Sequence, residues 1–369
     1  MPIVIIHGIG VREDGFKRLA ACCEPILRKY LLSPLRLETL ETRWVYWGRH
    51  GAWFAWNLQS LPRAGVLESL GATPDEQITE APAQDGLLFE AQRDLPALIN
   101  QLVVQAIQRD ELDPEALIAL YDAAHLPQVQ QAVKNAQSEE ELRNILVDAL
   151  AARKTRSLEV MGEIGIKAAL EALLKTAIEA TDYPLRLARV IIQRFLRPAF
   201  TELTARLLGD VMIYLANRGE PETPGAILQT VQTSLVPAPN EPLIVLTHSM
   251  GGNIFYDLIT YYAPDVQVDA WVSVAGQVGL LEELKLFKAS NPAVRSPKRV
   301  AVSSNIGYWL NVYDPVDVLG FAASPIFDGV EDMSYKTGSG WSAHALEQYF
   351  GAPRFYETIA PKLEAVLRR

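Results

Sequence analysis

The strongest constraint on the fold is a segment in which an apolar strand, a tight turn and a helix follow one another without a gap, from Leu243 to Ile259. The strand is the uninterrupted apolar run 243–246, and the turn is the sequence Thr-His-Ser-Met-Gly-Gly. A short apolar run without polar alternation is typical of a strand covered on both faces of a parallel sheet. Because parallel strands are usually connected by helices, the segment predicts an α/β fold with a mainly parallel central sheet.

Hydrophobic periodicity divides the chain into three zones. Residues 1–50 alternate between strand and helix patterns, residues 51–215 show helical spacing almost throughout, and the alternation resumes over residues 216–369. A chain of 369 residues is long enough for about two domains, or for one domain with a large insertion. We therefore predict one split α/β domain, 1–50 with 216–369, interrupted by an all-helical insertion, 51–215.

Several elements are predicted individually. Strands at Ile3–Ile6 and Arg43–Trp47 flank a helix at Gly15–Leu32. In the insertion, helical spacing covers Leu87–Gln108, Ser138–Lys154, Leu158–Ala180 and Pro184–Leu215. Beyond the insertion, Thr223-Pro224 is predicted to cap a helix, and Trp309–Tyr313 is predicted to be a strand. Right-handed crossovers place the carboxyl ends of parallel strands along one edge, where we expect the functional residues.

Charge and cysteine content narrow the class of protein. The chain has 34 Lys and Arg against 44 Asp and Glu, a net charge of −10, which argues against binding to nucleic acid phosphates. Cys22 and Cys23 are adjacent, so they cannot easily form a disulfide with each other or supply a four-ligand zinc site. We therefore expect no structural disulfide and no structural metal.

The apolar residues at the N-terminus are predicted to be a strand and not a targeting segment. Residues 1–8 have neither a basic region nor a small-residue cleavage site, as a secretory signal would. Elsewhere, charges interrupt the apolar runs before they reach the length of a membrane span, as in Leu185–Leu196. We expect a soluble, cytoplasmic protein.

The serine in the turn at 247–252 is a candidate nucleophile. A serine at a strained turn between strand and helix projects its hydroxyl above the sheet, and the positive end of the helix dipole stabilises a developing oxyanion. Small neighbours are needed because the turn crowds the chain, and the pattern is Thr247-x-Ser249-x-Gly251, with threonine in place of the usual first glycine. The alternative is a surface serine in a glycine-rich turn.

A second glycine-rich turn follows the first strand, in the sequence His7-Gly8-Ile9-Gly10. When a serine of this kind acts as the nucleophile, the oxyanion hole combines the amide after the serine with an amide from the loop after an early strand. These amides are predicted to be those of Met250 and Ile9. His7 itself has the simpler interpretation of a buried, hydrogen-bonded turn residue.

A nucleophilic serine needs a base and an acid, which in this chain order follow it. Of the five histidines, only His344 comes after Ser249, and it lies in a loop rich in glycine and serine. Its alternative is a solvated loop histidine. Two carboxylates, Asp314 and Asp317, follow the strand at 309–313, and we favour Asp317 because its place in the loop lets the side chain turn back toward the histidine.

These residues resemble the α/β-hydrolase lipases and esterases, and within them the group of GPI inositol-deacylase-like proteins and DDHD-type phospholipases. The run Leu-Thr-His-Ser-Met-Gly-Gly resembles the nucleophile segment of that group. The segment 311–317, Asn-Val-Tyr-Asp-Pro-Val-Asp, is similar to its Asn-x-Tyr-x-Pro-x-Asp segment, which ends in the triad acid. Asp332, Gly338, His344 and Tyr349 follow the spacing of the group, whereas Val318 stands where the group usually has proline.

The resemblance implies a serine hydrolase of carboxylic esters, with lipid esters as the favoured class and no cofactor. Its catalytic residues would be Ser249, Asp317 and His344, acting through an acyl-enzyme, with Asp314 as the alternative acid. The same triad serves thioesterases, peptidases and acyltransferases. A different alternative is a catalytically silent module whose helical insertion binds a partner.

The insertion has two interpretations, a lid that shapes the acyl site and a subdomain that packs on the sheet or mediates dimerisation. Arginines at 186, 189, 194 and 197 lie on or near an apolar helix, which suits peripheral contact with an anionic membrane, although a solvated face is the more common explanation. The aromatic residues of 44–56 either line an acyl site or pack in the core; they are Trp44, Tyr46, Trp47, Trp53 and Trp56. The expected partner is a small-molecule or lipid ester, and the sequence does not predict the oligomeric state.

Overall fold

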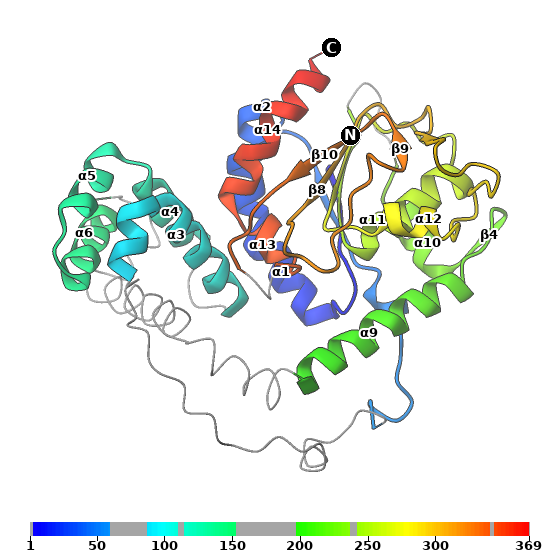
Figure 1. The fold of residues 1–369 in the computed structure, drawn as a ribbon, viewed down its shortest axis with the longest axis horizontal. Coiled ribbons are helices and arrows are strands. Elements are labelled where there is room, and N and C mark those ends of the chain that lie inside the picture. The colour runs from blue at the N-terminus through cyan, green and yellow to red at the C-terminus, as the bar shows by residue number, and fades with distance from the viewer. Residues whose placement is uncertain are drawn as a thin grey trace. The chain divides into compact units, whose positions relative to one another are not determined.

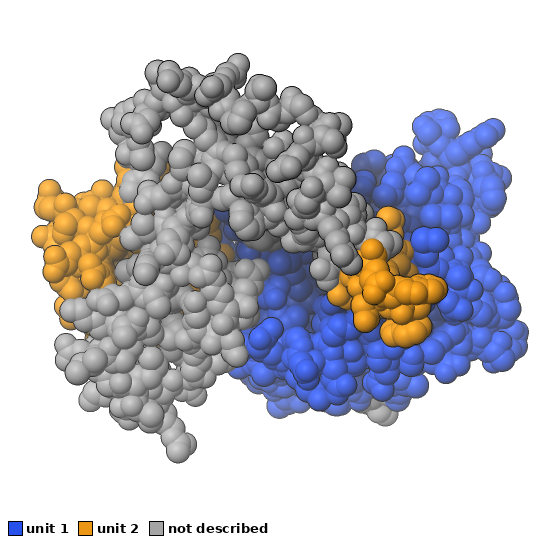
Figure 2. Space-filling view, turned by 90° about the horizontal axis from the view of Figure 1, so that it is seen from below, with its two compact units in different colours: residues 1–51, 210–369 blue, residues 52–209 orange. Residues whose placement is uncertain are grey.

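A computed structural model of the chain describes residues 3–59, 87–109, 114–152, 197–236, 242–339 and 343–368. The chain divides into two compact units, shown in different colours in Figure 2. Unit 1 comprises residues 1–51 and 210–369, and unit 2 comprises residues 52–209. Among the described helices, none is both long enough and apolar enough to cross a lipid bilayer.

Within the described part of unit 1, six strands form one sheet in which all neighbours are parallel (Figure 1). The strand order across the sheet is β10-β8-β6-β5-β1-β2. The strands are β1 (Ile3–Ile6), β2 (Thr42–Val45), β5 (Ile244–His248), β6 (Ala270–Val274), β8 (Trp309–Tyr313) and β10 (Val330–Ser334). The prediction of an α/β fold with a mainly parallel sheet is confirmed. Two further pairs of short strands are β3 (Gly219–Glu220) with β4 (Thr223–Pro224), and β7 (Val300–Ala301) with β9 (Phe327–Asp328).

Helices lie on both faces of this sheet, with α1 and α14 on one side and α10, α11 and α12 on the other (Figure 1). The helices and helical turns of unit 1 are α1 (Glu13–Leu27), η1 (Arg28–Leu32), α2 (Ser33–Leu35), η2 (Gly48–His50), α10 (Ala226–Gln232), α11 (Met250–Asp257), η5 (Leu258–Tyr262), α12 (Val278–Glu283), α13 (Glu347–Phe350) and α14 (Pro353–Leu367). Helix α9 (Arg197–Ala216) spans the boundary between the units. The predicted helix at Gly15–Leu32 thus corresponds to α1 and η1.

The central strands are buried on both faces because helices cover both. Val4 and Ile6 belong to a core cluster with Phe255 of α11, and successive residues of a strand point to opposite faces. All four residues of β1 are buried, which explains why its sequence shows no polar alternation. In the same cluster, Trp271 and Trp309 stack with their ring centroids 4.1 Å apart.

One local prediction is wrong. Thr223-Pro224 does not cap a helix but forms strand β4, which pairs with β3, and α10 begins after Gly225. The hairpin is closed by the N–H of Gly225, which donates to the carbonyl oxygen of Arg218 at 2.7 Å. A Cβ at position 225 would lie 1.8 Å from the carbonyl oxygen of Asn217, so only glycine fits this close approach.

Outside residues 52–59, the described part of unit 2 consists of helices with short connections at 125–126 and 136–138. Its helices are α3 (Leu87–Arg109), α4 (Pro114–Ala124), α5 (Pro127–Asn135) and α6 (Glu139–Ala151), followed by the first part of α9. Ser138 caps α6, because its Oγ accepts a hydrogen bond from the N–H of Glu141 at 3.1 Å. The predicted helix Leu158–Ala180, and the arginines at 186, 189 and 194, lie outside the described residues.

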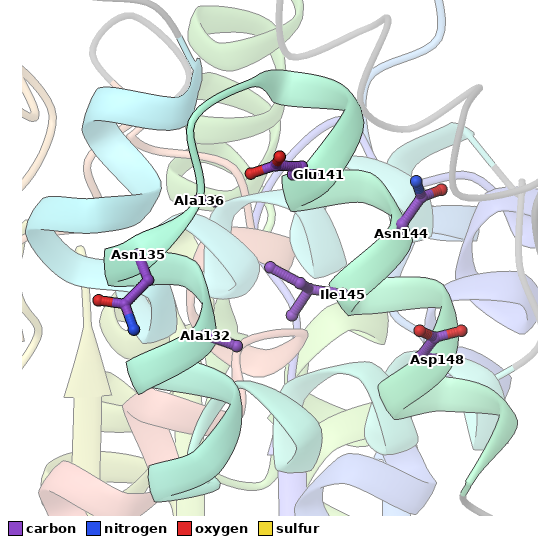
Figure 3. Close-up of a pocket in the computed structure, with 7 residues that line it drawn as sticks. All are labelled: Ala132, Asn135, Ala136, Glu141, Asn144, Ile145 and Asp148. Carbon is purple, nitrogen blue, oxygen red and sulfur yellow. The ribbon is translucent and has the colours of Figure 1, made fainter.

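A shallow pocket lies between α5 and α6 of unit 2 (Figure 3). It is lined by Ala132, Asn135, Ala136, Glu141, Asn144, Ile145 and Asp148. None of these residues was singled out as a candidate for function by the sequence analysis. The candidate catalytic residues Ser249, Asp317 and His344 belong to unit 1, whereas the pocket is lined by residues of unit 2.

Candidate active site

The predicted nucleophile and acid follow the carboxyl ends of two parallel strands of the sheet, β5 and β8, with β6 between them. Ser249 comes directly after β5, and Asp317 lies in the loop after β8. His344 precedes the short helix α13. In open parallel sheets, ligand sites lie outside the carboxyl ends of the strands, so the topology alone brings these segments to one edge.

The turn at Ser249 is strained and tightly enclosed. Ser249 has φ 51° and ψ −126°, a conformation that residues with a Cβ rarely adopt. Such strain costs about 1–3 kcal/mol. It is offset by the burial of the surrounding apolar side chains, each of which contributes about 1.5–3 kcal/mol. A Cβ at Gly251 would lie 2.5 Å from the carbonyl oxygen of Ile6, which explains why the turn requires a small residue there.

The threonine that replaces the first glycine of the serine pattern has a structural role. Thr247 is fully buried in β5, and its Oγ1 accepts a hydrogen bond from Nε1 of Trp271 at 2.9 Å. Buried indole N–H groups need an acceptor, so the hydroxyl satisfies a donor that would otherwise be left unpaired in the core. Threonine in place of the first glycine is therefore accommodated within the buried strand before the turn.

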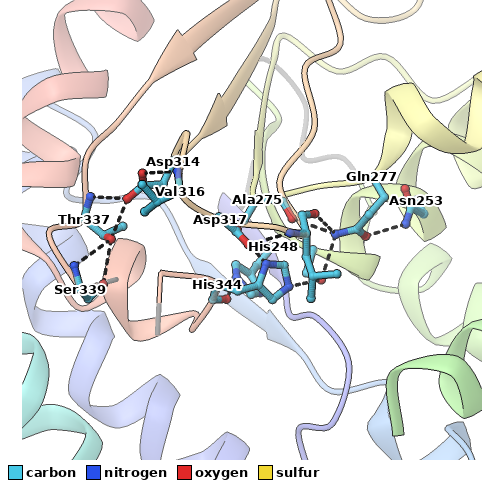
Figure 4. Close-up of polar contacts among 12 residues, drawn as sticks. His248, Asn253, Ala275, Gln277, Asp314, Val316, Asp317, Thr337, Ser339 and His344 are labelled. Carbon is cyan, nitrogen blue, oxygen red and sulfur yellow. Dashed lines mark hydrogen bonds and ion pairs between the residues drawn. The ribbon is translucent and has the colours of Figure 1, made fainter. Parts of the chain in front are cut away.

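The structure brings together the predicted nucleophile, base and acid. Nε2 of His344 lies 2.9 Å from Oγ of Ser249, and Nδ1 of His344 lies 2.8 Å from Oδ2 of Asp317 (Figure 4). A carboxylate only accepts hydrogen bonds, so Nδ1 carries a proton and, in the neutral ring, Nε2 is free to accept the serine hydroxyl proton. The Asp317 side chain is 1% exposed, which shields this contact from water.

The other candidate acid makes different contacts. Oδ2 of Asp314 accepts hydrogen bonds from the N–H of Thr337 at 2.7 Å and from its Oγ1 at 2.8 Å, and Oδ1 accepts from the N–H of Val316 at 3.1 Å. In Figure 4, Asp314 faces Thr337, whereas Asp317 faces His344. Asp314 thus joins the loop after β8 to the segment that leads toward the histidine.

The two predicted oxyanion amides lie in segments next to Ser249. Met250 is the first residue of α11, where backbone N–H groups have no carbonyl partner within the helix. On the other side, the loop that contains Ile9 packs directly against the serine. A Cβ at Gly8 would lie 2.8 Å from Cβ of Ser249, so the glycine is what allows this approach.

His7 holds the loop of Ile9 in place. The described hydrogen bonds of its ring go to the backbone and not to Ser249, His344 or Asp317. Its Nδ1 lies 2.5 Å from the carbonyl oxygen of Gly8, and its Nε2 lies 3.2 Å from the backbone N of Trp47. These partners fix the tautomer, since the carbonyl requires a donor and the N–H requires an acceptor. Burial lowers the pKa of His7 to about 4, which keeps the ring neutral. These contacts agree with the interpretation of His7 as a buried, hydrogen-bonded turn residue.

No family model, curated protein or solved structure matches the chain. The chemistry of the site is therefore inferred from its own residues. Within the described ranges, His, Cys, Asp and Glu side chains do not gather in a group of three or more that could hold a metal ion. Cys22 and Cys23 are buried in α1, and neither forms a disulfide.

Sequence reasoning missed Gln277, which follows β6 at the same edge of the sheet. Its Nε2 lies 3.5 Å from Oγ of Ser249 and donates to the carbonyl oxygen of Leu319 at 2.7 Å. Its Oε1 accepts from Nδ2 of Asn253 at 3.0 Å, as Figure 4 shows. The amide thus links the serine turn to the loop of Asp317. The signal for it is its position just after a strand, but no motif distinguishes it from other polar loop residues.

Among the aromatic residues of 44–56, those of unit 1 make no described contact with Ser249. Trp47 is buried and stacks on His7 with a centroid distance of 5.0 Å, and Nε1 of Trp44 donates to Glu24 at 2.8 Å. Trp53 and Trp56 belong to unit 2 and are 82% and 74% exposed. Core packing accounts for the tryptophan at 47, and the described contacts do not connect these rings into an acyl site.

Proposed function

We propose that the protein is a serine hydrolase that cleaves carboxylic esters on an α/β-hydrolase fold, with Ser249, His344 and Asp317 as its triad. The observation that carries this proposal is the continuous chain of contacts, 2.9 Å from serine to histidine and 2.8 Å from histidine to aspartate. A serine hydroxyl is a weak nucleophile unless a base within hydrogen-bond reach removes its proton. The base in turn needs a group that fixes its tautomer and stabilises its charged form.

In the first half of the reaction, Oγ of Ser249 attacks the ester carbonyl carbon while Nε2 of His344 takes the hydroxyl proton. The negative charge that develops on the carbonyl oxygen is held by the amides of Met250 and Ile9. Collapse of this intermediate breaks the bond to the alkoxide, which receives the proton from His344 and leaves as an alcohol. Asp317 stabilises the imidazolium form throughout.

In the second half, a water molecule attacks the acyl-enzyme carbonyl, and His344 takes the proton of the water. The acyl–serine bond then breaks, the proton returns to Oγ of Ser249, and the carboxylic acid is released. All steps are proton transfers and acyl transfers between the triad, the substrate and water.

Lipid esters are the substrate class that we propose. Val316 and Val318, which flank Asp317, are 61% and 73% exposed, so apolar side chains border the acid of the triad. An apolar border favours an acyl chain over a charged group, because burying a charge without a partner is costly. The dependence of the rate on acyl chain length tests this part of the proposal.

The test is covalent labelling with a fluorophosphonate, followed by intact-mass measurement and by hydrolysis of p-nitrophenyl esters from short to long acyl chains. Wild type should gain one adduct and hydrolyse the esters, with faster turnover of the longer chains. Ser249→Ala should gain none and have no turnover, although its melting temperature shows that it is folded. Ser304→Ala, at an exposed serine far along the chain, is the matched control and should behave as wild type.

Three results would contradict the proposal or a part of it. A folded wild type that is neither labelled nor active on any ester would refute the hydrolase. Labelling that persists in Ser249→Ala would move the nucleophile to another residue. Equal turnover of all chain lengths would leave the hydrolase in place and reject lipid esters as its substrates.

A further inference from the structure

Asp210 lies where the chain returns to unit 1. The first segment of unit 1 ends at Gly51, and the second begins at Asp210, within helix α9. These two residues are in close contact, since a Cβ at Gly51 would lie 2.5 Å from Oδ1 of Asp210. Asp210 is fully buried, at 0% exposure. Both connections to the insertion therefore meet at one buried carboxylate.

The same carboxylate holds the loop that contains Ile9. Oδ2 of Asp210 accepts a hydrogen bond from the N–H of Gly10 at 3.0 Å, and Oδ1 lies 3.7 Å from Nη2 of Arg12. The N–H of Gly10 belongs to the peptide group that joins it to Ile9. Because a peptide group is planar, a bond to this N–H fixes the carbonyl and the Cα of Ile9. The N–H of Ile9 lies in the preceding peptide group, whose carbonyl oxygen, that of Gly8, is held by Nδ1 of His7 at 2.5 Å.

Packing alone does not account for a carboxylate at this position. Taking a charged group out of water costs free energy, and an apolar side chain of similar volume usually serves a core equally well or better. A buried carboxylate does offer a strong, directional acceptor for a backbone N–H. What Asp210 provides is therefore a fixed position for the loop at 8–12.

We propose that Asp210 is a positioning residue for the oxyanion hole. Through the N–H of Gly10, it holds the amide of Ile9 where negative charge develops on the substrate carbonyl oxygen. Because Asp210 is part of α9, whose first residues belong to unit 2, the helix that leaves the insertion contacts the loop of the oxyanion hole through this side chain. This inference rests on the proposed hydrolase function.

A second anchor of α9 provides a matched control. The hydroxyl of Tyr214 donates to Oδ2 of Asp257 at 2.8 Å, and Nη1 of Arg218 lies 3.0 Å from the same oxygen. This anchor fixes the same helix to α11, and the hydrogen bonds described for it do not involve the loop of Ile9. Tyr214→Phe removes one of its bonds, so it loosens α9 while leaving the acceptor for Gly10 intact.

The experiment compares Asp210→Ala, Asp210→Asn and Tyr214→Phe with wild type, using the p-nitrophenyl ester that wild type hydrolyses fastest. Misplacing an oxyanion donor should lower kcat of Asp210→Ala by about 10- to 100-fold with little change in KM. The rate of fluorophosphonate labelling should fall in parallel, because the phosphonyl oxygen occupies the same hole. Asp210→Asn keeps an acceptor oxygen and should recover most of kcat, whereas Tyr214→Phe should lower the melting temperature and leave kcat unchanged.

The inference is wrong if folded Asp210→Ala retains the kcat of wild type, or if Tyr214→Phe loses kcat to the same extent. If Asp210→Ala does not fold, Asp210→Leu, which fills the volume without offering an acceptor, replaces it in the same comparison. Wild type without serine-dependent activity is a separate outcome, since it would refute the proposed function itself before any variant at position 210 is compared.

Discussion

Nε2 of His248 lies 2.9 Å from the backbone carbonyl oxygen of His344. Since a carbonyl only accepts, Nε2 carries the proton of the His248 ring. Burial, reinforced by the neighbouring His344, lowers the pKa of His248 well below its usual value, so the ring is neutral. The residue before the proposed nucleophile therefore supports the backbone of the proposed base.

Removing this support should slow the reaction. His248→Leu places an apolar side chain against Tyr349 and Phe350, but it removes the Nε2–H that donates to the carbonyl oxygen of His344. We expect kcat to fall by about 10- to 100-fold, because a small misplacement of a catalytic group is costly. The free energy of unfolding should fall by about 1–3 kcal/mol. His248→Gln, whose amide can donate, should recover part of both, and wild-type kcat in the leucine variant would show that the contact is incidental.

The two aspartates after β8 should differ in the kind of effect they have. Asp317→Asn removes the carboxylate that faces His344 and should lower kcat by about 10⁴-fold with little change in stability, as expected when the histidine tautomer is no longer fixed. Asp314→Asn instead weakens contacts to Thr337 and Val316, so it should lower the free energy of unfolding by about 1–3 kcal/mol with a smaller effect on kcat. Steady-state kinetics and urea unfolding of both variants measure this, and the reverse ranking would make Asp314 the acid.

The sequence was sufficient for the features that depend on local pattern. The strands at Ile3–Ile6 and Trp309–Tyr313 are predicted with the bounds that the structure has, because both are short runs rich in apolar or aromatic residues and ended by turn residues. The placement of Ser249, Asp317 and His344 near one another followed from parallel topology, which sends successive loops to one edge. Their catalytic roles stay predictions.

The features that were missed depend on contacts between distant segments. Asp210 and Gly10 are 200 residues apart, and Gln277 meets the carbonyl of Leu319 across two loops. Neither pairing leaves a periodicity or a motif in the sequence. The prediction for Thr223-Pro224 is wrong for a related reason. Pro before an apolar periodic run is the pattern of a helix start, while the hairpin depends on the pairing of β3 with β4 and on the bond from the N–H of Gly225 to the carbonyl oxygen of Arg218.

The threonine at position 247 should matter for stability and not for turnover. Thr247→Val keeps the shape of the side chain but removes the acceptor for Nε1 of Trp271. Leaving this buried donor unpaired should lower the free energy of unfolding by about 1–3 kcal/mol, while kcat per folded molecule stays within about twofold of wild type. Thr247→Ser, which keeps the hydroxyl, is the control and should lose less stability. A large loss of kcat in the valine variant would place the threonine in the chemistry of the turn.

His7 should make stability depend on pH below neutrality. In the folded chain its pKa is about 4 because the ring is buried, whereas an exposed histidine ring has a pKa of 6.5. Between these values the unfolded chain binds a proton that the folded chain does not. The free energy of unfolding therefore falls as the pH drops from about 6.5 to 4, and one histidine with this difference contributes about 3 kcal/mol to the fall. Protonation also removes the acceptor at Nε2 for the N–H of Trp47.

Urea unfolding of wild type and His7→Gln from pH 7 to pH 4 isolates this contribution, because glutamine does not titrate and the other ionisable groups are shared. At pH 7 the glutamine variant should be less stable, since it loses the stacking of His7 on Trp47. The difference in free energy of unfolding between the two proteins should narrow by about 3 kcal/mol from pH 7 to pH 4, because only wild type has a histidine at position 7 that binds a proton on unfolding. Parallel curves would mean that His7 takes up its proton over the same pH range in the folded and the unfolded chain, so that at pH 4 the loop at 8–10 would be held by a charged ring.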